Sequence, residues 1–208
     1  FMQKTGVNFP EIFEYCNNEQ QKELAKKAPV HEVLLDMAVE KLPSPLVAQE
    51  YRIPNIWQGD LDSEVGKTMV NCDADGPLSL MITKIWMDPH AGEVAVGRVY
   101  SGTIKQGETV WASGAGKAER VQQVSMMVGG DRIQVPGVSA GNIAALTGVR
   151  SAAAGVTITR DKDETPFEAI RHYSEPVVTV AIEPKSMKDL PKFIGALRSL
   201  AKSDASLS

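Results

Sequence analysis

The segment Gly66-Lys67-Thr68 has the residue types that end a P-loop, a loop that binds nucleotide phosphates. That chemistry needs another glycine five positions before Gly66, because backbone N–H groups must wrap around the phosphates. Leu61 stands at that position, and the surrounding residues are acidic, which repels phosphate. We therefore expect a solvated loop here and no nucleotide site.

A second pattern, Gly137-Val-Ser-Ala-Gly141, fits the G-x-S-x-G motif of serine hydrolases, with Ser139 in the place of the nucleophile. The motif works only where a strand precedes the serine and a helix follows it. The next residues, 142–147, have the composition of a strand instead. The favoured interpretation is a turn, and the alternative is an enzyme with a site of its own that uses Ser139 or a metal.

Potential metal ligands are present but lack the spacing of a metal site. Residues 71–76 begin like a calcium loop, but Ile82 stands where that loop needs a glutamate that supplies two oxygens. The remaining candidates share no ligand spacing and no paired motif: His31, His90, His172, Cys16 and Cys72. We expect free thiols, and no catalytic, cofactor-binding or metal-binding residue in this chain.

Positive side chains are the one group left that could meet a ligand. Residues 1–75 carry 7 Lys or Arg against 13 Asp or Glu, residues 76–150 carry 7 against 5, and residues 151–208 carry 8 against 8. The middle part is thus slightly basic, and accessible cations suffice to contact phosphates without reading sequence. The candidates that face RNA are Arg98, Lys105, Lys117 and Arg120. The alternative is that they are solubility charges on a protein surface.

These cations lie in a region with the pattern of short strands. Alternation and β-branched residues predict strands at 78–87, 94–100, 108–112, 119–127, 142–149 and 155–159, with turn residues between them. This density of strands favours a small antiparallel barrel. We expect Leu80, Ile82, Val96 and Val99 among its buried residues.

The flanks have helical patterns. Residues 29–42 place Val30, Val33, Leu34, Met37 and Ala38 on one apolar face, and a shorter helix is expected at 10–27. Such a face needs a larger partner to cover it. Residues 43–75 are rich in Pro, Gly, Asn and Asp, and we expect a crossing segment there with at most one short strand.

The C-terminal part changes character again. Residues 176–183 alternate like a strand, and the apolar spacing from Leu190 to Leu200 predicts a helix that begins near Asp189, with Pro191 in its first turn. A single strand and a single helix leave apolar surface uncovered, so we expect this segment to pack on the barrel or to self-associate with the same segment of a neighbouring molecule.

The composition is that of a soluble globular protein. Of the 208 residues, 43% are hydrophobic and 23% are charged, and the net charge is −4. No apolar run approaches the ~18 residues of a membrane span, and residues 1–5 lack the apolar core of a signal peptide. We expect a cytoplasmic protein that has no membrane partner.

Several motifs also carry a resemblance. Residues 76–81 (Gly-Pro-Leu-Ser-Leu-Met), 97–102 (Gly-Arg-Val-Tyr-Ser-Gly) and 140–145 (Ala-Gly-Asn-Ile-Ala-Ala) resemble the second domain of translational GTPases. The flanking residues 42–45, 51–60 and 174–183 are similar to the archaeal-type elongation factor 2 family among them. The similarity runs from about Lys4 to Ser203.

The resemblance implies an internal fragment of a longer factor. Its fold is expected to be mainly β, a six-stranded antiparallel Greek-key barrel with N-terminal helices and a C-terminal strand-helix piece. Residues 1–42 correspond to the last helices of the GTPase domain, 43–75 to a linker, 76–172 to the second-domain barrel and 173–208 to the start of the third domain.

The resemblance also implies the function. The whole factor binds GTP and magnesium and drives the movement of tRNA and mRNA, whereas this part is expected to be non-catalytic. Its partners are small-subunit ribosomal RNA, met through the barrel, and the remaining domains of the factor. The alternatives are the same region of a ribosome-biogenesis or splicing GTPase, and a free-standing RNA-binding barrel.

Overall fold

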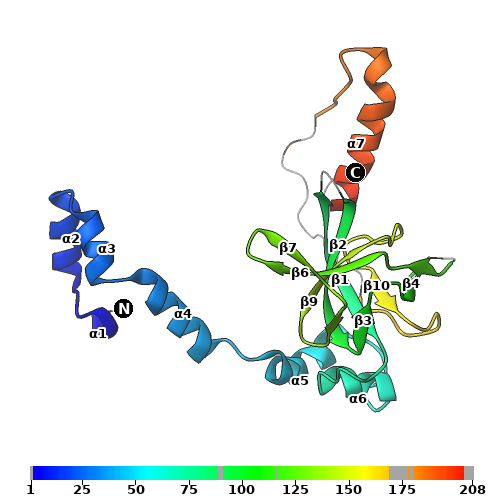
Figure 1. Cartoon of the computed structure of the whole chain (residues 1–208), viewed down its shortest axis with the longest axis horizontal. Helices are drawn as coiled ribbons and strands as arrows, with labels where there is room; N and C mark the ends of the chain where they lie inside the picture. The colour runs from blue at the N-terminus through cyan, green and yellow to red at the C-terminus, as the bar shows by residue number, and fades with distance from the viewer. Residues whose placement is uncertain (1, 89–90, 116, 169–177, 179, 204–208) are drawn as a thin grey trace. The chain divides into compact units, whose positions relative to one another are not determined.

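A computed structural model describes residues 2–88, 91–115, 117–168, 178 and 180–203. Contacts between Cα atoms divide the chain into two units, residues 1–44 and residues 45–208. The first unit is helical, and the second carries the sheet (Figure 1).

The first unit consists of short helices, α1 (Met2–Thr5), α2 (Phe9–Asn17), α3 (Gln21–Lys27) and α4 (Val30–Lys41). The helix expected at 10–27 is therefore two helices, separated at residues 18–20. The helix expected at 29–42 is α4, with Pro29 at the N-cap position, one residue before the first turn.

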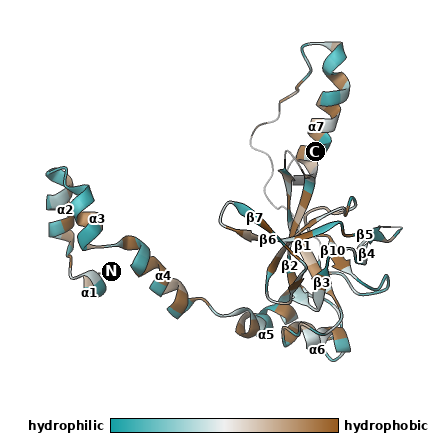
Figure 2. Cartoon of the chain, viewed as in Figure 1, coloured by the Kyte–Doolittle hydropathy of each residue, from teal (hydrophilic) through white to brown (hydrophobic). Residues whose placement is uncertain are grey.

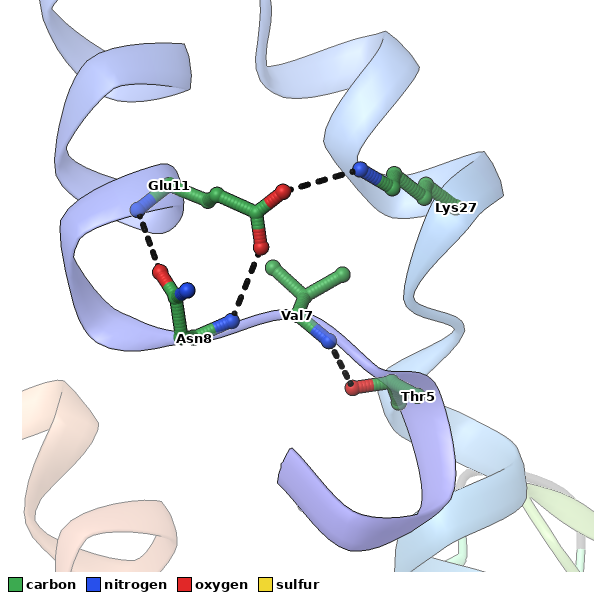
Figure 3. A network of polar contacts seen from close by, with 5 residues as sticks. All are labelled: Thr5, Val7, Asn8, Glu11 and Lys27. Carbon is green, nitrogen blue, oxygen red and sulfur yellow. Dashed lines mark hydrogen bonds and ion pairs between the residues drawn. The ribbon is translucent and has the colours of Figure 1, made fainter.

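A reciprocal cap fixes the start of α2 and joins it to α3 (Figure 3). The Asn8 Oδ1 atom accepts a hydrogen bond from the Glu11 amide at 2.9 Å, and Glu11 Oε2 accepts one from the Asn8 amide at 3.1 Å. The other oxygen of Glu11 lies 3.2 Å from Lys27 Nζ at the end of α3. These contacts satisfy N–H groups that the first turn leaves without an intrahelical partner.

The predicted apolar face of α4 is largely uncovered (Figure 2). The side chains of Val30, Leu34 and Met37 are each more than half exposed, and no residue of α4 is buried. That a larger partner covers this face stays a prediction.

The second unit is built on an eight-stranded antiparallel sheet in the order β5-β4-β10-β1-β2-β9-β6-β7, which curls into a half-barrel (Figure 1). A separate pair joins β3 and β8. The strands are β1 (Ser79–Asp88), β2 (Gly92–Ser101), β3 (Thr103–Lys105), β4 (Thr109–Ala112), β5 (Glu119–Arg120), β6 (Gln123–Val128), β7 (Asp131–Val135), β8 (Gly137–Ser139), β9 (Ile143–Thr147) and β10 (Thr157–Thr159).

The expected fold class needs correction on two points. The chain mixes helix and strand rather than being mainly β, and the sheet has eight strands rather than six. The run predicted at 119–127 is divided between β5 and β6, and the sequence pattern missed β3, β7 and β8. The missed strands are short, and β7 carries charged and polar side chains that hide its alternation.

The sheet buries one continuous core. Leu80, Ile82 and Val99 are fully buried, as predicted, and Leu80 lies opposite Val99 in the β1–β2 ladder. Val96 is only half-buried, so that prediction was wrong. Val96 lies opposite the exposed Lys84, and the alternation along β2 places it on the face opposite to that of Val99.

Residues 43–75 form two helices, α5 (Pro45–Ile56) and α6 (Glu64–Val70), and not the short strand that we expected. Ser63 caps α6 by accepting a hydrogen bond from the Gly66 amide at 3.1 Å. Both helices contribute to a second apolar cluster, formed by Ile53, Trp57, Met69 and Phe167. The clustered side chains pack this segment beside β2, because Tyr100 joins the same cluster.

The C-terminal part contains a 3-10 turn (Met187–Asp189) followed by α7 (Leu190–Ser203), so the predicted helix is confirmed with Pro191 in its first turn. The predicted strand at 176–183 is not formed at residues 178 and 180–183, and its remaining residues lie outside the described part of the chain. Within the described ranges, no helix has the length and apolar character to cross a bilayer.

Candidate nucleic-acid interface

All four predicted cations belong to the unit that carries the sheet. Arg98 lies on β2, Lys105 ends β3, Arg120 ends β5, and Lys117 lies in the connection between β4 and β5. The side chains of Lys105, Lys117 and Arg120 are exposed, whereas Arg98 is half-buried.

Arg98 faces an aromatic side chain on its own strand. Its guanidinium carbon lies 5.8 Å from the centre of the Tyr100 ring, within the range of a cation–π contact. Tyr100 in turn packs on Phe167, with 4.6 Å between the ring centres. This contact holds the guanidinium group at the surface of the second apolar cluster.

The structure adds a residue that the sequence pattern did not single out. Burial raises the pKa of Tyr100, and the positive charges of Arg98 and Arg52 partly oppose that rise. Arg52 comes from α5 and is exposed, so two guanidinium groups from different elements lie near one hydroxyl. Sequence spacing cannot show this pairing, although Arg52 lies inside the 51–60 motif that carried the resemblance.

Lys105 and Arg120 both lie beside the turn between β3 and β4. Arg120 Nε donates a hydrogen bond to the Gly107 carbonyl at 3.1 Å, and the Gly107 amide donates to the Val121 carbonyl at 2.8 Å. Gly107 has a φ of 78°, which a residue with a side chain rarely adopts. An open hollow of about 580 Å³ beside the turn is lined by Gln106, Gly107, Arg120, Val121 and Gln122.

The nearby acids are engaged in internal contacts. Glu108 Oε2 accepts a hydrogen bond from the Lys105 amide at 2.9 Å, and Glu108 Oε1 forms an ion pair with Arg160. Glu119 accepts from the Ser151 amide and from its hydroxyl, both at 3.0 Å. Among the residues that the structure describes, no carboxylate lies within ion-pair distance of Lys105, Lys117 or Arg120.

This arrangement suits contact with phosphates. Accessible cations without an internal carboxylate partner can neutralise backbone phosphates, and the strength of such binding depends on salt. Arg120 lines the hollow beside the turn, whose lining includes none of the other three cations. The geometry therefore supports positioning on a polyanion rather than sequence readout.

The P-loop-like segment is part of a helix, and the loop that we expected there was wrong. Gly66 is buried inside α6, where a Cβ atom would lie 2.6 Å from the Asp60 carbonyl oxygen and 2.7 Å from the Leu61 Cα atom. The glycine thus permits close packing of α6 on the preceding backbone. Lys67 is exposed on this seven-residue helix, and no loop surrounds it to hold phosphates.

The turn interpretation at Ser139 is confirmed. Ser139 ends β8 opposite Thr103, and the strand β9 follows after a short turn. The Asn142 side-chain amide donates to the Ser139 carbonyl at 3.2 Å, which closes this turn. Across the described ranges, no three His, Cys, Asp or Glu residues come together to hold a metal. Cys16 and Cys72 are free thiols, His31 is exposed on α4, and His90 and His172 lie outside the described part.

Comparison with known proteins finds one family that matches most of the sheet and relatives that match almost the whole chain. The elongation factor Tu domain 2 family matches residues 92–159, from β2 to β10. The chain is 55% identical over 201 residues to elongation factor 2 of Picrophilus torridus, a match that covers 97% of this chain and 27% of the relative. It is 54% identical over 206 residues to elongation factor 2 of Methanococcus maripaludis and 52% identical over 206 residues to that of Thermoplasma acidophilum.

These matches cover 98% and 99% of this chain, and each covers 28% of the relative. The chain thus spans little more than a quarter of the length of these curated relatives. The similarity covers almost the whole of this chain, and the match to the domain family covers strands β2 to β10 of the sheet unit. The chain is therefore homologous to a region of archaeal elongation factor 2 that includes a domain of the elongation factor Tu domain 2 family.

Proposed function

We propose that this region is the non-catalytic ribosome-docking and scaffold module of elongation factor 2. It contacts the RNA of the small ribosomal subunit through Arg98, Lys105, Lys117 and Arg120, with Arg52 beside Arg98. The observation that carries the proposal is the set of cations on a translation-factor domain whose neighbouring acids, Glu108 and Glu119, are engaged elsewhere.

The domain assignment extends this proposal. Residues 1–42 are the last helices of the GTPase domain, 43–75 link it to a second-domain Greek-key barrel at 76–172, and 173–208 begin the third domain. The uncovered apolar face of α4 supports the first assignment, because the rest of a GTPase domain would bury it. The packing of α5 and α6 beside β2 makes these two helices part of the same compact unit as the sheet.

The nucleotide chemistry belongs to other parts of the factor. We propose that GTP and magnesium bind there, and that the whole cytoplasmic factor drives the movement of tRNA and mRNA on the ribosome. The burial of Gly66 inside α6 supports this division, because this segment offers no phosphate-binding loop. A stiff barrel between two further bodies can transmit a rotation that follows the nucleotide state.

Co-sedimentation of the chain with isolated small ribosomal subunits tests the proposal. Binding through about four phosphates should weaken with salt, with a slope of log K against log salt of roughly −3 to −4. Binding that ignores salt, or that equally favours a naked RNA of defined sequence, would support a free-standing RNA-binding barrel. Preference for immature over mature subunits would instead indicate a biogenesis GTPase.

A further inference from the structure

A small cavity of about 250 Å³ lies on the sheet unit, and its lining includes none of the four proposed RNA contacts. Its walls come from β4 and the turn after it, from β10, and from the loop that follows β10. Its lining includes Trp111, Ser113, Thr157, Thr159, Lys162 and Glu164. Drug-sized ligands occupy roughly 300–1,000 Å³, so this cavity suits a single side chain or a compact small molecule.

Each of the three hydroxyl groups of the cavity makes a hydrogen bond to the backbone of the sheet unit. Ser113 Oγ accepts from the Thr157 amide at 3.0 Å, and Thr157 Oγ1 accepts from the Phe167 amide at 2.9 Å. The Thr159 hydroxyl donates to the Asp161 carbonyl at 2.6 Å. The charged and aromatic groups of the cavity, which can recognise a charged ligand, are Glu164, Lys162 and the Trp111 ring.

Glu164 carries a buried carboxyl group at the wall of the cavity. Its Oε1 atom is buried and has no hydrogen-bond partner among the residues that the structure describes. A buried carboxylate oxygen without a donor is unfavourable. Burial, with a smaller contribution from the negative charge of Asp161, raises the pKa of Glu164 to about 7. A cation in the cavity beside this carboxyl would favour the ionised form of Glu164.

Trp111 supplies a second cation-binding element. Lys162 Nζ lies 5.7 Å from the centre of the Trp111 ring, so the ring face already attracts a positive charge. Lys162 is exposed on a long flexible stem, and it can leave the ring at little cost. Arg160, the neighbouring cation, is held by Glu108 and does not compete.

We propose that this cavity binds a guanidinium group, which stacks on Trp111 in place of Lys162 and donates hydrogen bonds to Glu164. A guanidinium group is planar, weakly hydrated and carries a fork of donors, so it satisfies the ring and the carboxylate together. An ammonium group would only repeat what Lys162 provides. The group can come from an arginine side chain of a partner protein or from a free guanidino compound.

NMR of the full 208-residue chain tests the site with two probes, N-acetyl-arginine methylamide and methylguanidinium. The indole N–H signal of Trp111, identified by its loss in Trp111→Phe, should shift and saturate with both. Tighter binding of the arginine amide indicates a protein side chain, and tighter binding of methylguanidinium indicates a free compound. N-acetyl-lysine methylamide should bind at least about tenfold more weakly.

Matched variants separate this site from general charge attraction. Glu164→Gln should weaken binding at least about tenfold, whereas Asp163→Asn, which removes the same charge from an exposed neighbour, should leave it unchanged. Lys162→Ala should keep or tighten binding because it removes the competing cation. The signals of Trp57 and Trp86 report whether each variant is folded. The absence of saturable shifts, equal binding of the lysine analogue, or equal losses in Glu164→Gln and Asp163→Asn would overturn the proposal.

Discussion

The side-chain amide of Gln49 donates a hydrogen bond to the Tyr100 carbonyl at 2.9 Å and so ties α5 to β2. The same nitrogen also donates to the Met69 carbonyl on α6. Gln49 is almost fully buried, so one polar side chain connects two helices and a strand at the edge of the second apolar cluster. This contact explains how a segment with the composition of a linker becomes a packed part of the sheet unit.

Removal of this amide should destabilise the chain. Gln49→Ala removes the side-chain donor to the Tyr100 carbonyl and one of the donors to the Met69 carbonyl, and it should lower the free energy of unfolding by about 1–3 kcal/mol. Urea unfolding followed by circular dichroism measures the change. Glu50→Ala, at the exposed neighbouring position, is the matched control and should change stability by less than about 0.5 kcal/mol. Equal effects of the two changes would mean that Gln49 does not connect these elements.

The sequence pattern predicted some parts of this unit well because the local signal was strong there. Ile82, Leu80 and Val99 lie in long strands with clear alternation, and their burial follows from that pattern. Val96 lies three residues before Val99, and the period of two along a strand places these side chains on opposite faces, so the prediction that both are buried was wrong. The solvated loop expected at residues 66–68 was wrong, because Gly66 lets α6 pack closely on the preceding backbone, a contact that the local sequence does not reveal.

The difference between the inner and outer faces of the sheet can be measured directly at Ile82 on β1 and Val96 on β2. Ile82→Ala should cost about 2–5 kcal/mol, because it removes buried methyl groups and leaves a cavity. Val96→Ala, at a half-buried position opposite Lys84, should cost clearly less, about 1 kcal/mol. Chemical unfolding of both variants measures this contrast. If the two costs were equal, the register around residues 82–84 would be wrong.

The candidate site was only partly accessible from the sequence. The cationic residues could be named because they lie in the slightly basic middle part of the chain, near the motif that predicted the barrel. Their partners could not, because Arg52, Glu108 and Glu119 reach them or their neighbours only through the fold. Because Glu108 and Glu119 bind other groups of the fold, they do not form surface ion pairs with Lys105 or Arg120.

Glu164 predicts a pH dependence of stability. Its pKa lies at about 7 in the fold against an ordinary 4.5, so the fold favours the protonated form. The stability from this preference is fully present below pH 4.5 and is lost as the pH rises through about 7. After a discount for partial exposure, the loss should be roughly 1–2 kcal/mol.

Urea or thermal unfolding measured between pH 4.5 and 7 should show this loss of stability in the parent chain and a smaller loss in Glu164→Gln. Asp163→Asn, which changes an exposed neighbour, should keep the pH profile of the parent. Identical profiles for the parent and Glu164→Gln would show that the carboxyl is not buried as described.

The segment before α7 should drive self-association. Val178, Val180 and Ile182 are largely exposed, and burial of each in a contact between copies should contribute about 1.5–3 kcal/mol. Light scattering should therefore show a mass that rises with concentration. Val180→Asp should weaken the association at least about tenfold, whereas Lys185→Asp should not. A strictly monomeric parent chain at all concentrations would contradict this prediction.

Charge reversal in the ribosome-binding assay tests the central claim most directly. Arg98→Glu and Lys105→Glu should each weaken the association with small ribosomal subunits at least about tenfold, because a charge-assisted hydrogen bond contributes ~1.5–3 kcal/mol. Each should also flatten the salt slope by about 0.7–0.9. Lys188→Glu, an equal charge change at an exposed position outside the sheet, should leave both quantities unchanged. Unaltered binding and slope for Arg98→Glu and Lys105→Glu would show that these residues are solubility charges and that the sheet does not dock through them.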